Sequence, residues 1–144
     1  MGQKVNPIGL RVGISKTWNS KWYAGKDYPE QLKQDLSIQK FVKKRLKHAA
    51  ISHIEVERTA KKTKVNIFTA RPGIIIGRKG DEVERLKHEL NKLTRHEVIV
   101  NIKEIKRPEI EATLVAENIA NQLERRIAYR RAIRRAMTSA MRMN

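Results

Sequence analysis

The sequence has no cysteine, few aromatic residues and no long apolar run. The missing cysteines exclude disulfides, thiol catalysis and thiolate metal sites. Its four histidines form no H-x-x-x-H or H-x-H pair that could hold a metal from one element, so we expect surface histidines and no cofactor. No apolar run approaches the roughly 18 residues of a membrane span, and neither a signal peptide nor a myristoylation pattern is present. We therefore expect a soluble, intracellular protein without a membrane partner.

Positive charge is what the sequence has in excess. Lys and Arg number 32 against 15 Asp and Glu, a formal net charge of +17 over 144 residues. Such self-repulsion destabilises an unpartnered fold and favours a polyanionic partner, above all nucleic acid. The charge is concentrated at two acid-free ends, because residues 1–26 contain five cations and residues 125–144 contain seven arginines. We expect both ends to contact phosphates.

The first 26 residues predict a basic arm. They show no helical or strand period and are interrupted by proline and glycine, so we expect order only against a partner, with Lys4 and Arg11 as RNA-binding candidates. Trp18, Trp22 and Tyr23 are the aromatic residues of the arm. Anchoring the arm onto the domain is the favoured interpretation of these three residues, and stacking on bases is the alternative.

Residues 27–108 predict a domain of mixed helices and strands. A helix is expected to begin at Asp27 as N-cap, with Pro29 in the first turn. Its apolar positions at helical spacing are Leu32, Leu36, Phe41, Val42 and Leu46. Apolar and polar residues then alternate over 54–57 and 64–67 around a short basic turn at 60–62, which predicts a β-hairpin.

A short helical turn, a second helix and a third strand complete this predicted domain. The turn begins at Arg71 and Pro72, packs residues 74–76 inward and ends at Gly77. The helix follows Gly80, with its apolar spacing carried by Val83, Leu86, Leu90 and Leu93. The third strand is expected over 97–105, closed by Pro108.

The segment 109–144 is helical by composition. An apolar stripe runs along its first part through Ala112, Ala116, Ile119, Leu123 and Ile127. Continued at 100° per residue, this stripe reaches Arg130 and Arg134 before Met137 and Met141 restore it. One unbroken helix would be about three times the mean length. We therefore predict a packed helix up to about residue 126, a break near 127–129, and a second helix that presents arginines.

The stretch Gly77-Arg78-Lys79-Gly80 lies where the second helix begins. Glycines let the loop backbone approach a nucleic-acid backbone, the first helical amides add partial positive charge, and Arg78 and Lys79 supply full charges. Other phosphate-binding loops do not fit, because the spacing of a Walker A loop and its hydroxyl are missing and no G-x-G-x-x-G is present. An RNA-recognition sheet would need stacked aromatics, and the predicted strands contain only Phe68.

In this order of elements, the G-x-x-G loop resembles that of the RNA-binding KH domain, type II. The resemblance implies an α+β fold with a three-stranded sheet packed on one side by helices. The KH domain would span residues 27–108, with its core at about 38–106. The basic N-terminal arm at 1–26 and the Arg-rich helical segment at 109–144 would flank it.

More extended motifs resemble the bacterial-type small-subunit ribosomal protein family uS3 (S3) from end to end. They are residues 2–14 (GQKVNPIGLRVGI), 18–22 (WNSKW), 69–80 (TARPGIIIGRKG), 122–126 (QLERR) and 130–137 (RRAIRRAM). The resemblance implies a protein of the subunit head that binds 16S rRNA and lines the path by which mRNA enters. Arg130, Arg131 and Arg134 match the positions that contact incoming mRNA and assist its unwinding.

The same resemblance implies neighbours. These are the head proteins uS10 and uS14, with uS4 and uS5 around the point where mRNA enters. Family members continue through a Gly-rich linker into a second α/β domain that this sequence does not include, so contacts made through that domain are not expected of this chain.

Two alternatives stay open at this point. An independent KH module, such as an assembly factor, would share the loop but would not need the specific arm. A nuclease or lyase would need a carboxylate pair, a metal cluster or an activated lysine. Glu82 and Glu84 lie beside the loop, two residues apart on a helix, where they point in different directions and favour its dipole. We therefore predict a protein that is not an enzyme.

Overall fold

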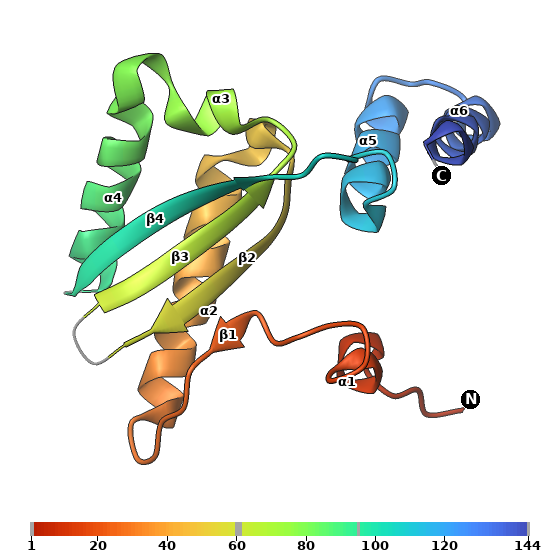
Figure 1. The fold of residues 1–144 in the computed structure, drawn as a ribbon. Coiled ribbons are helices and arrows are strands. Elements are labelled where there is room, and N and C mark those ends of the chain that lie inside the picture. The colour runs from red at the N-terminus through yellow and green to blue at the C-terminus, as the bar shows by residue number, and fades with distance from the viewer. Residues whose placement is uncertain (1, 60–61, 95, 144) are drawn as a thin grey trace.

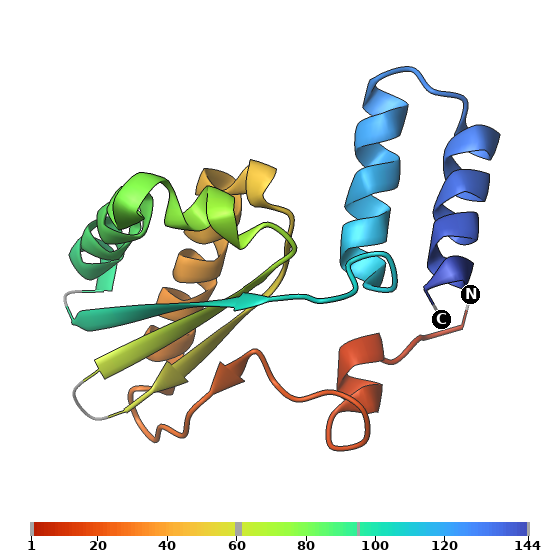
Figure 2. The same cartoon turned by 45° about the horizontal axis from the view of Figure 1, so that its top comes forward.

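The computed structural model describes residues 2–59, 62–94 and 96–143. Figures 1 and 2 show a twisted sheet with helices on one face and the C-terminal helices beyond its end. The elements in chain order are α1 (Pro7–Arg11), β1 (Ser20–Lys21), α2 (Tyr28–Arg45), the 3₁₀ turn η1 (Lys47–Ala49), β2 (Ile51–Arg58), β3 (Lys62–Thr69), α3 (Pro72–Ile76), η2 (Arg78–Gly80), α4 (Asp81–Thr94), β4 (Glu97–Glu104), α5 (Ala112–Glu124) and α6 (Tyr129–Arg142). None of these described helices has the length and apolarity that crossing a membrane requires.

The sheet has the strand order β1-β2-β3-β4. The predicted hairpin is confirmed, since β2 and β3 are antiparallel with Ile54 opposite Ile67 and Val56 opposite Val65. Strand β4 then runs parallel to β3. The three predicted strands are present, and the two-residue β1 adds a fourth parallel to β2. Of the predicted hairpin turn, residues 60 and 61 lie outside the described residues.

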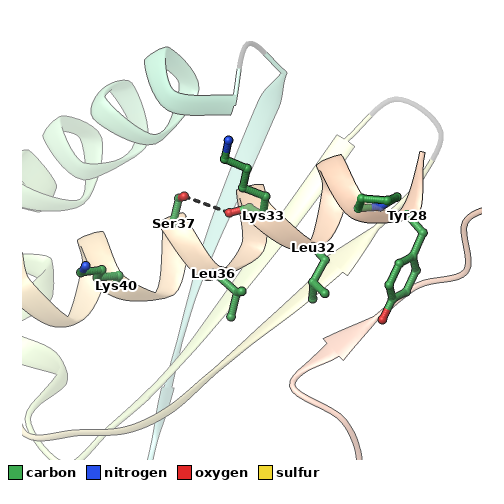
Figure 3. Close-up of a pocket in the computed structure, with 7 residues that line it drawn as sticks. Tyr28, Leu32, Lys33, Leu36, Ser37 and Lys40 are labelled. Atoms are coloured by element: carbon green, nitrogen blue, oxygen red, sulfur yellow. Dashed lines mark hydrogen bonds between the residues drawn. The ribbon is translucent and has the colours of Figure 1, made fainter. Parts of the chain in front are cut away.

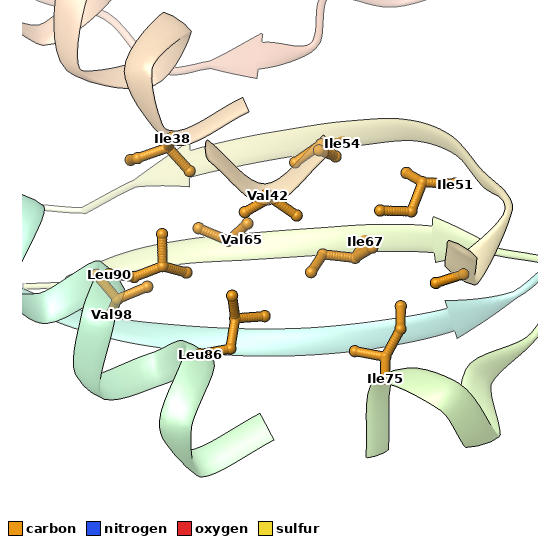
Figure 4. Close-up of a cluster of buried hydrophobic side chains, with 11 residues drawn as sticks. Ile38, Val42, Ile51, Ile54, Val65, Ile67, Ile75, Leu86, Leu90 and Val98 are labelled. Carbon is orange, nitrogen blue, oxygen red and sulfur yellow. The ribbon is translucent and has the colours of Figure 1, made fainter. Parts of the chain in front are cut away.

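One apolar core lies between the sheet and the helices α2, α3 and α4 (Figure 4). Alternate residues of the strands face it, because successive side chains of a strand point to opposite faces. The core residues are Ile38 and Val42 of α2, Ala49 of η1, Ile51, Ile54, Val65, Ile67 and Val98 of the strands, Ile75 of α3, and Leu86 and Leu90 of α4. This arrangement confirms the predicted α+β fold with helices on one side of the sheet.

The buried side of α2 agrees with the predicted one in part, since Val42 is buried and Phe41 and Leu46 pack against the core. Asp35, Ile38 and Val42 are buried, whereas Leu36 is 58% exposed. Leu36 was predicted on the buried side and is exposed instead, while Asp35, a carboxylate of a kind seldom buried unless it is paired, is buried. Asp27 does occupy the N-cap position, but its side chain makes no capping hydrogen bond.

The inward packing predicted for residues 74–76 holds for the middle residue alone. Ile75 is fully buried, while Ile74 and Ile76 are 46% and 43% exposed. Neighbouring residues on a helix point about 100° apart, so three consecutive side chains cannot share one core. Likewise Leu93, predicted on the buried stripe of α4, is 49% exposed, and Thr94 is buried in its place.

The N-terminal arm contains more regular structure than predicted. Asn6 Oδ1 caps α1 by accepting from the amides of Ile8 and Gly9 at 2.9 and 3.3 Å. Strand β1 pairs with β2, and the amide of Val56 donates to the carbonyl of Asn19 at 2.7 Å. The expectation of an arm without order of its own was therefore wrong at these two segments, where a side-chain cap and an open sheet edge supply the missing hydrogen bonds.

Trp22 anchors the arm, as one interpretation of its aromatics predicted. Its Nε1 donates to Asp35 Oδ2 at 2.6 Å, and Arg58 Nε donates to Oδ1 of the same carboxylate at 2.9 Å. The buried Asp35 is thus paired as well as hydrogen-bonded. Trp18 and Tyr23 do not share this role, since they are 60% and 98% exposed.

The C-terminal segment forms two helices, α5 and α6, as predicted. The break falls between Glu124 and Tyr129, where Arg126 adopts a left-handed φ of 61°. Helix α6 packs on α5, and its buried residue is Ala132. Met137 and Met141 are 60% and 77% exposed, contrary to the expected return of the apolar stripe, because the side of Ala132 faces α5 instead.

The stripe predicted for α5 was also wrong in part. Ala112 and Ala116 are exposed, Leu123 is 44% exposed, and Leu114 is the residue of α5 that is buried. Helix α5 contacts both α6 and β2. Because α5 has two neighbouring elements, its buried positions do not follow a single continuous apolar stripe.

Candidate nucleic-acid interface

Gly77 ends α3 and opens the G-x-x-G loop. Its backbone has φ 67° and ψ −169°, and its amide donates to the carbonyl of Gly73 at 3.0 Å. A Cβ at this position would lie 3.0 Å from Cβ of Glu82. This region of conformational space is essentially limited to glycine. Gly77 is therefore required by the fold of the loop itself.

Gly80 is a glycine for a different reason. It has φ 89°, yet a Cβ there would meet no atom within 4 Å. Arg78 is exposed beside it, and the backbone from Arg78 to Gly80 forms the turn η2 directly before α4. The open space over Gly80 at a helix start fits the close approach of a phosphate backbone that the sequence predicted. RNA binding by Gly77, Arg78, Lys79 and Gly80 stays a prediction.

The acids beside the loop form contacts that belong to the fold. Glu82 pairs with Arg45 at 3.6 Å and with Arg85 at 4.0 Å, and Arg45 also pairs with Glu89 at 3.5 Å. Among the described residues, no group of three or more His, Asp or Glu side chains could hold a metal ion. The geometry assigns these carboxylates to joining α2 and α4.

The second basic surface lies on α6. We call it the arginine groove. It is lined by Ala128, Arg130, Arg131, Arg134, Arg135, Thr138, Ser139 and Arg142. None of its arginines pairs with a carboxylate within the described part of the chain. Arg130 instead lies over the Tyr129 ring, 5.7 Å from its centroid. The Nε of Arg130 also donates to the Tyr129 hydroxyl at 3.1 Å. Guanidinium groups without a carboxylate partner are suited to bind phosphates.

Arg135 and Arg142 were missed by the sequence interpretation. They share the arginine groove with Arg131 and Thr138, at spacings of four, three and four residues. These spacings place all four residues on one face of a helix. The signal was present in the sequence but was overlooked, because the predicted face followed the apolar stripe of α5 instead.

The predicted RNA-binding residues do not form one site. In both Figure 1 and Figure 2 the α3–α4 connection and α6 lie at opposite sides of the molecule. Lys4 and Arg11 belong to the arm and are exposed, with Arg11 Nη1 donating to the carbonyl of Pro7 in its own helix at 2.7 Å. The structure thus places the predicted RNA-binding residues on separate surfaces.

A further hollow lies along the outer side of α2 (Figure 3). Its lining consists of Tyr28, Pro29, Leu32, Lys33, Leu36, Ser37 and Lys40. The Ser37 hydroxyl donates to the carbonyl of Lys33 at 2.9 Å, so it already has a partner within the helix. With apolar side chains and two lysines, this hollow offers neither a general base nor a nucleophile with its base.

Comparison with known proteins identifies the family. The KH domain family matches residues 37–110. Small ribosomal subunit protein uS3 of Geobacter sp. strain M21 is 62% identical over 142 residues, which cover 99% of this chain and 67% of that protein. Its counterparts in Geotalea uraniireducens strain Rf4 and Syntrophus aciditrophicus strain SB are 62% and 59% identical over 142 residues, 99% of this chain and 68% and 66% of theirs.

These similarities decide between the alternatives that the sequence left open. The relatives are ribosomal proteins, which are not enzymes, so the prediction of a protein that is not an enzyme is confirmed. An independent KH module would not match a ribosomal protein over 99% of its length. The chain, with its KH domain, belongs to the uS3 family of small ribosomal subunit proteins.

Proposed function

We propose that this chain lines the path by which mRNA enters the small ribosomal subunit and helps to unwind structured mRNA there. The coarser role, a structural RNA-binding protein of the cytoplasmic small subunit, follows from membership of the family and agrees with the net charge of +17. The finer role assigns a particular RNA to each basic surface. The arm and the G-x-x-G loop hold 16S rRNA, and the arginine groove contacts mRNA.

The arginine groove is the observation that carries this proposal. Five arginines of one helix lie together there without a described carboxylate partner. Ion pairs with carboxylates would have to be broken before a phosphate could bind, and here that cost is absent. Unpaired arginines on a rigid helix can hold one phosphate after another as a strand moves past, because such contacts are independent of base sequence.

The ion pairs of α2 support different roles for different basic residues. Arg45 is held by two glutamates of α4, so it contributes to the domain and is less available to RNA. Arg130, Arg131 and Arg134 have no comparable partner, and they are the positions that match the mRNA-contacting positions of the family.

Changing Arg130, Arg131 and Arg134 together to Ala tests the proposal. We expect the variant to enter subunits normally, as measured by its co-sedimentation with small subunits and complete ribosomes on a sucrose gradient. Translation through a stable mRNA hairpin should slow, while translation of unstructured mRNA should be unchanged. Changing Lys40, Lys43 and Lys44 to Ala removes the same charge from α2 and serves as the control. Loss of incorporation in the arginine variant would instead assign these residues to 16S rRNA.

Protein neighbours form the last part of the proposal. Of the neighbours expected in the head, uS10 and uS14 would lie against this chain, with uS4 and uS5 around the point where mRNA enters. The arm supports such contacts, because Val5, Ile8, Leu10 and Ile14 are 73%, 46%, 64% and 88% exposed. Apolar side chains exposed to this extent are typical of surfaces that a partner covers. Cross-linking within assembled subunits should join the arm to one of these proteins.

A further inference from the structure

A buried serine joins the sheet to the C-terminal helices. Ser52 of β2 is 4% exposed, and its hydroxyl donates to Glu111 Oε1 at 2.8 Å. The two residues are 59 positions apart, and Glu111 lies directly before α5. This hydrogen bond is part-buried and charge-assisted, and such bonds are among the stronger polar contacts of a protein. It joins the residue before α5 to the sheet.

His53 fixes the orientation of that hydroxyl. Its Nδ1 lies 3.0 Å from Ser52 Oγ, and its ring stacks on Phe68 with centroids 4.1 Å apart and planes 15° apart. The single proton of the serine hydroxyl is directed to Glu111, so Nδ1 must carry a proton and donate to Oγ. The stacked ring thus leaves the hydroxyl one acceptor, the carboxylate of Glu111.

The side chain of Glu111 does not cap the helix that follows it. It occupies the N-cap of α5, but its side chain caps no amide of the helix. The carboxylate is bound to Ser52 instead. One turn later Leu114, 7% exposed, lies on the same side of the helix, and α5 contacts β2. The start of α5 is therefore joined to β2 by the side-chain bond of Glu111, and α5 also packs against that strand.

We propose that Ser52 and Glu111 are positioning residues, which hold the α5–α6 pair, and with it the arginine groove, at a fixed orientation to the KH domain. The importance of that orientation rests on the proposed function, since a groove that guides mRNA must point along its path. The amide of Ile105 still donates to the carbonyl of Thr69 in β3 at 2.9 Å, and the chain then crosses to α5 without a further described backbone hydrogen bond to the sheet. The only hydrogen bond described between that crossing and α6 is exposed and long, from Arg107 Nη1 to the carbonyl of Met143 at 3.4 Å.

Distance measurements between spin labels on the full chain test this proposal. The absence of cysteine allows two labels to be placed cleanly, at Glu84→Cys on α4 and Asn121→Cys on α5, both exposed. We expect a narrow distance distribution in the parent chain. Ser52→Ala and, from the other side, Glu111→Ala should broaden it, because loss of one net hydrogen bond raises the detached population by roughly two- to tenfold.

Two conservative variants and one control keep the test specific. Ser52→Thr retains a hydroxyl and Glu111→Gln retains an acceptor oxygen, so both should keep the narrow distribution. Glu117→Ala removes an exposed acid from the same helix and should change nothing. An unchanged distribution in both alanine variants would overturn the proposal, as would equal broadening in Glu117→Ala.

A functional measurement separates this inference from the proposed function. Ribosomes that contain Ser52→Ala should slow on hairpin mRNA and keep their rate on unstructured mRNA. If the triple arginine variant leaves hairpin translation unchanged while Ser52→Ala still broadens the distances, the positioning role stands and the mRNA role falls. If the arginine variant slows and the distances stay narrow in Ser52→Ala and Glu111→Ala, the positioning role alone is overturned.

Discussion

Gly77 and Gly80 both have positive φ, but only Gly77 is crowded, by Glu82. We expect Gly77→Ala to lower the free energy of unfolding by about 1–3 kcal/mol, since the backbone strain adds to a steric contact. Gly80→Ala should lower the free energy of unfolding less. Relative to that loss it should weaken RNA binding more, because its Cβ would fill the space that the proposed function leaves for a phosphate. Denaturant titration and RNA titration of both variants check this. A larger loss of stability in Gly80→Ala than in Gly77→Ala would contradict the conclusion that Gly77 is the glycine that the fold of the loop requires.

His53 gives the fold a pH dependence. Burial lowers the pKa of this imidazole, with Glu55 and Glu111 opposing the shift and Lys16 and Lys21 adding to it. A lowered pKa means that the unfolded chain binds more protons between the folded pKa and 6.5, so the free energy of unfolding falls as the pH drops through that window. Urea titrations from pH 7.5 to 5.5 should show this loss, and His53→Gln should reduce it.

The control for that titration is His88→Gln, because His88 is exposed on α4. A reduction as large as that in His53→Gln would show that the effect is not specific to His53. Equal slopes in the parent chain and in His53→Gln would mean that the imidazole has the same proton affinity in the folded and unfolded chain. The prediction of surface histidines was wrong for His53, which is half-buried and lies between Ser52 and Phe68.

At the scale of elements, α6 differs from the other helices in presenting a row of arginines without described acidic partners. Changing Arg135 and Arg142 to Ala should reduce the slope of log K against log salt for single-stranded RNA by roughly 0.7 for each phosphate contact removed. Changing Lys43 and Lys44, which are exposed on α2, is the control of equal charge. A slope that falls equally in both variants would show that RNA responds to net charge alone and has no preference for the arginine groove.

Most elements could be predicted because their patterns are local. Alternation of apolar and polar residues predicted β2 and β3. Gly77 predicted the end of α3, and the excessive length of a single helix over 109–144 predicted a break after α5. The burial of Asp35 on α2 could not be predicted in the same way. It makes sense only once Trp22 and Arg58 are known to lie beside this carboxylate. Contacts between distant segments decide such positions, and periodicity carries no information about them.

The candidate site was predictable to a similar degree. The G-x-x-G loop and the first arginines of α6 were found from spacing and from resemblance. Ser52 and Glu111 were not, because a serine in a strand and an acid before a helix are ordinary residues until the fold brings them within 2.8 Å. Nor could the sequence show that the loop and α6 face different sides (Figures 1 and 2).

For the whole molecule, the formal net charge is +17, and the α3–α4 connection and α6 lie at opposite sides of the fold (Figures 1 and 2). Under the proposed function, the KH loop and the arm bind a fixed RNA, and the arginine groove contacts a strand that moves. Such a division would let one small protein be a structural part of the small subunit and also act on mRNA that passes through it. The central claim is therefore that the arginine groove contacts mRNA.

Photo-cross-linking from the arginine groove tests that claim most directly. A photoreactive amino acid in place of Ser139, which lines the groove without carrying charge, would be incorporated into translating ribosomes stalled before an mRNA hairpin. We predict a cross-link to mRNA ahead of the decoded codon, and its loss when the hairpin-bearing segment is removed. A cross-link to 16S rRNA alone, unchanged by the presence of mRNA, would contradict the account.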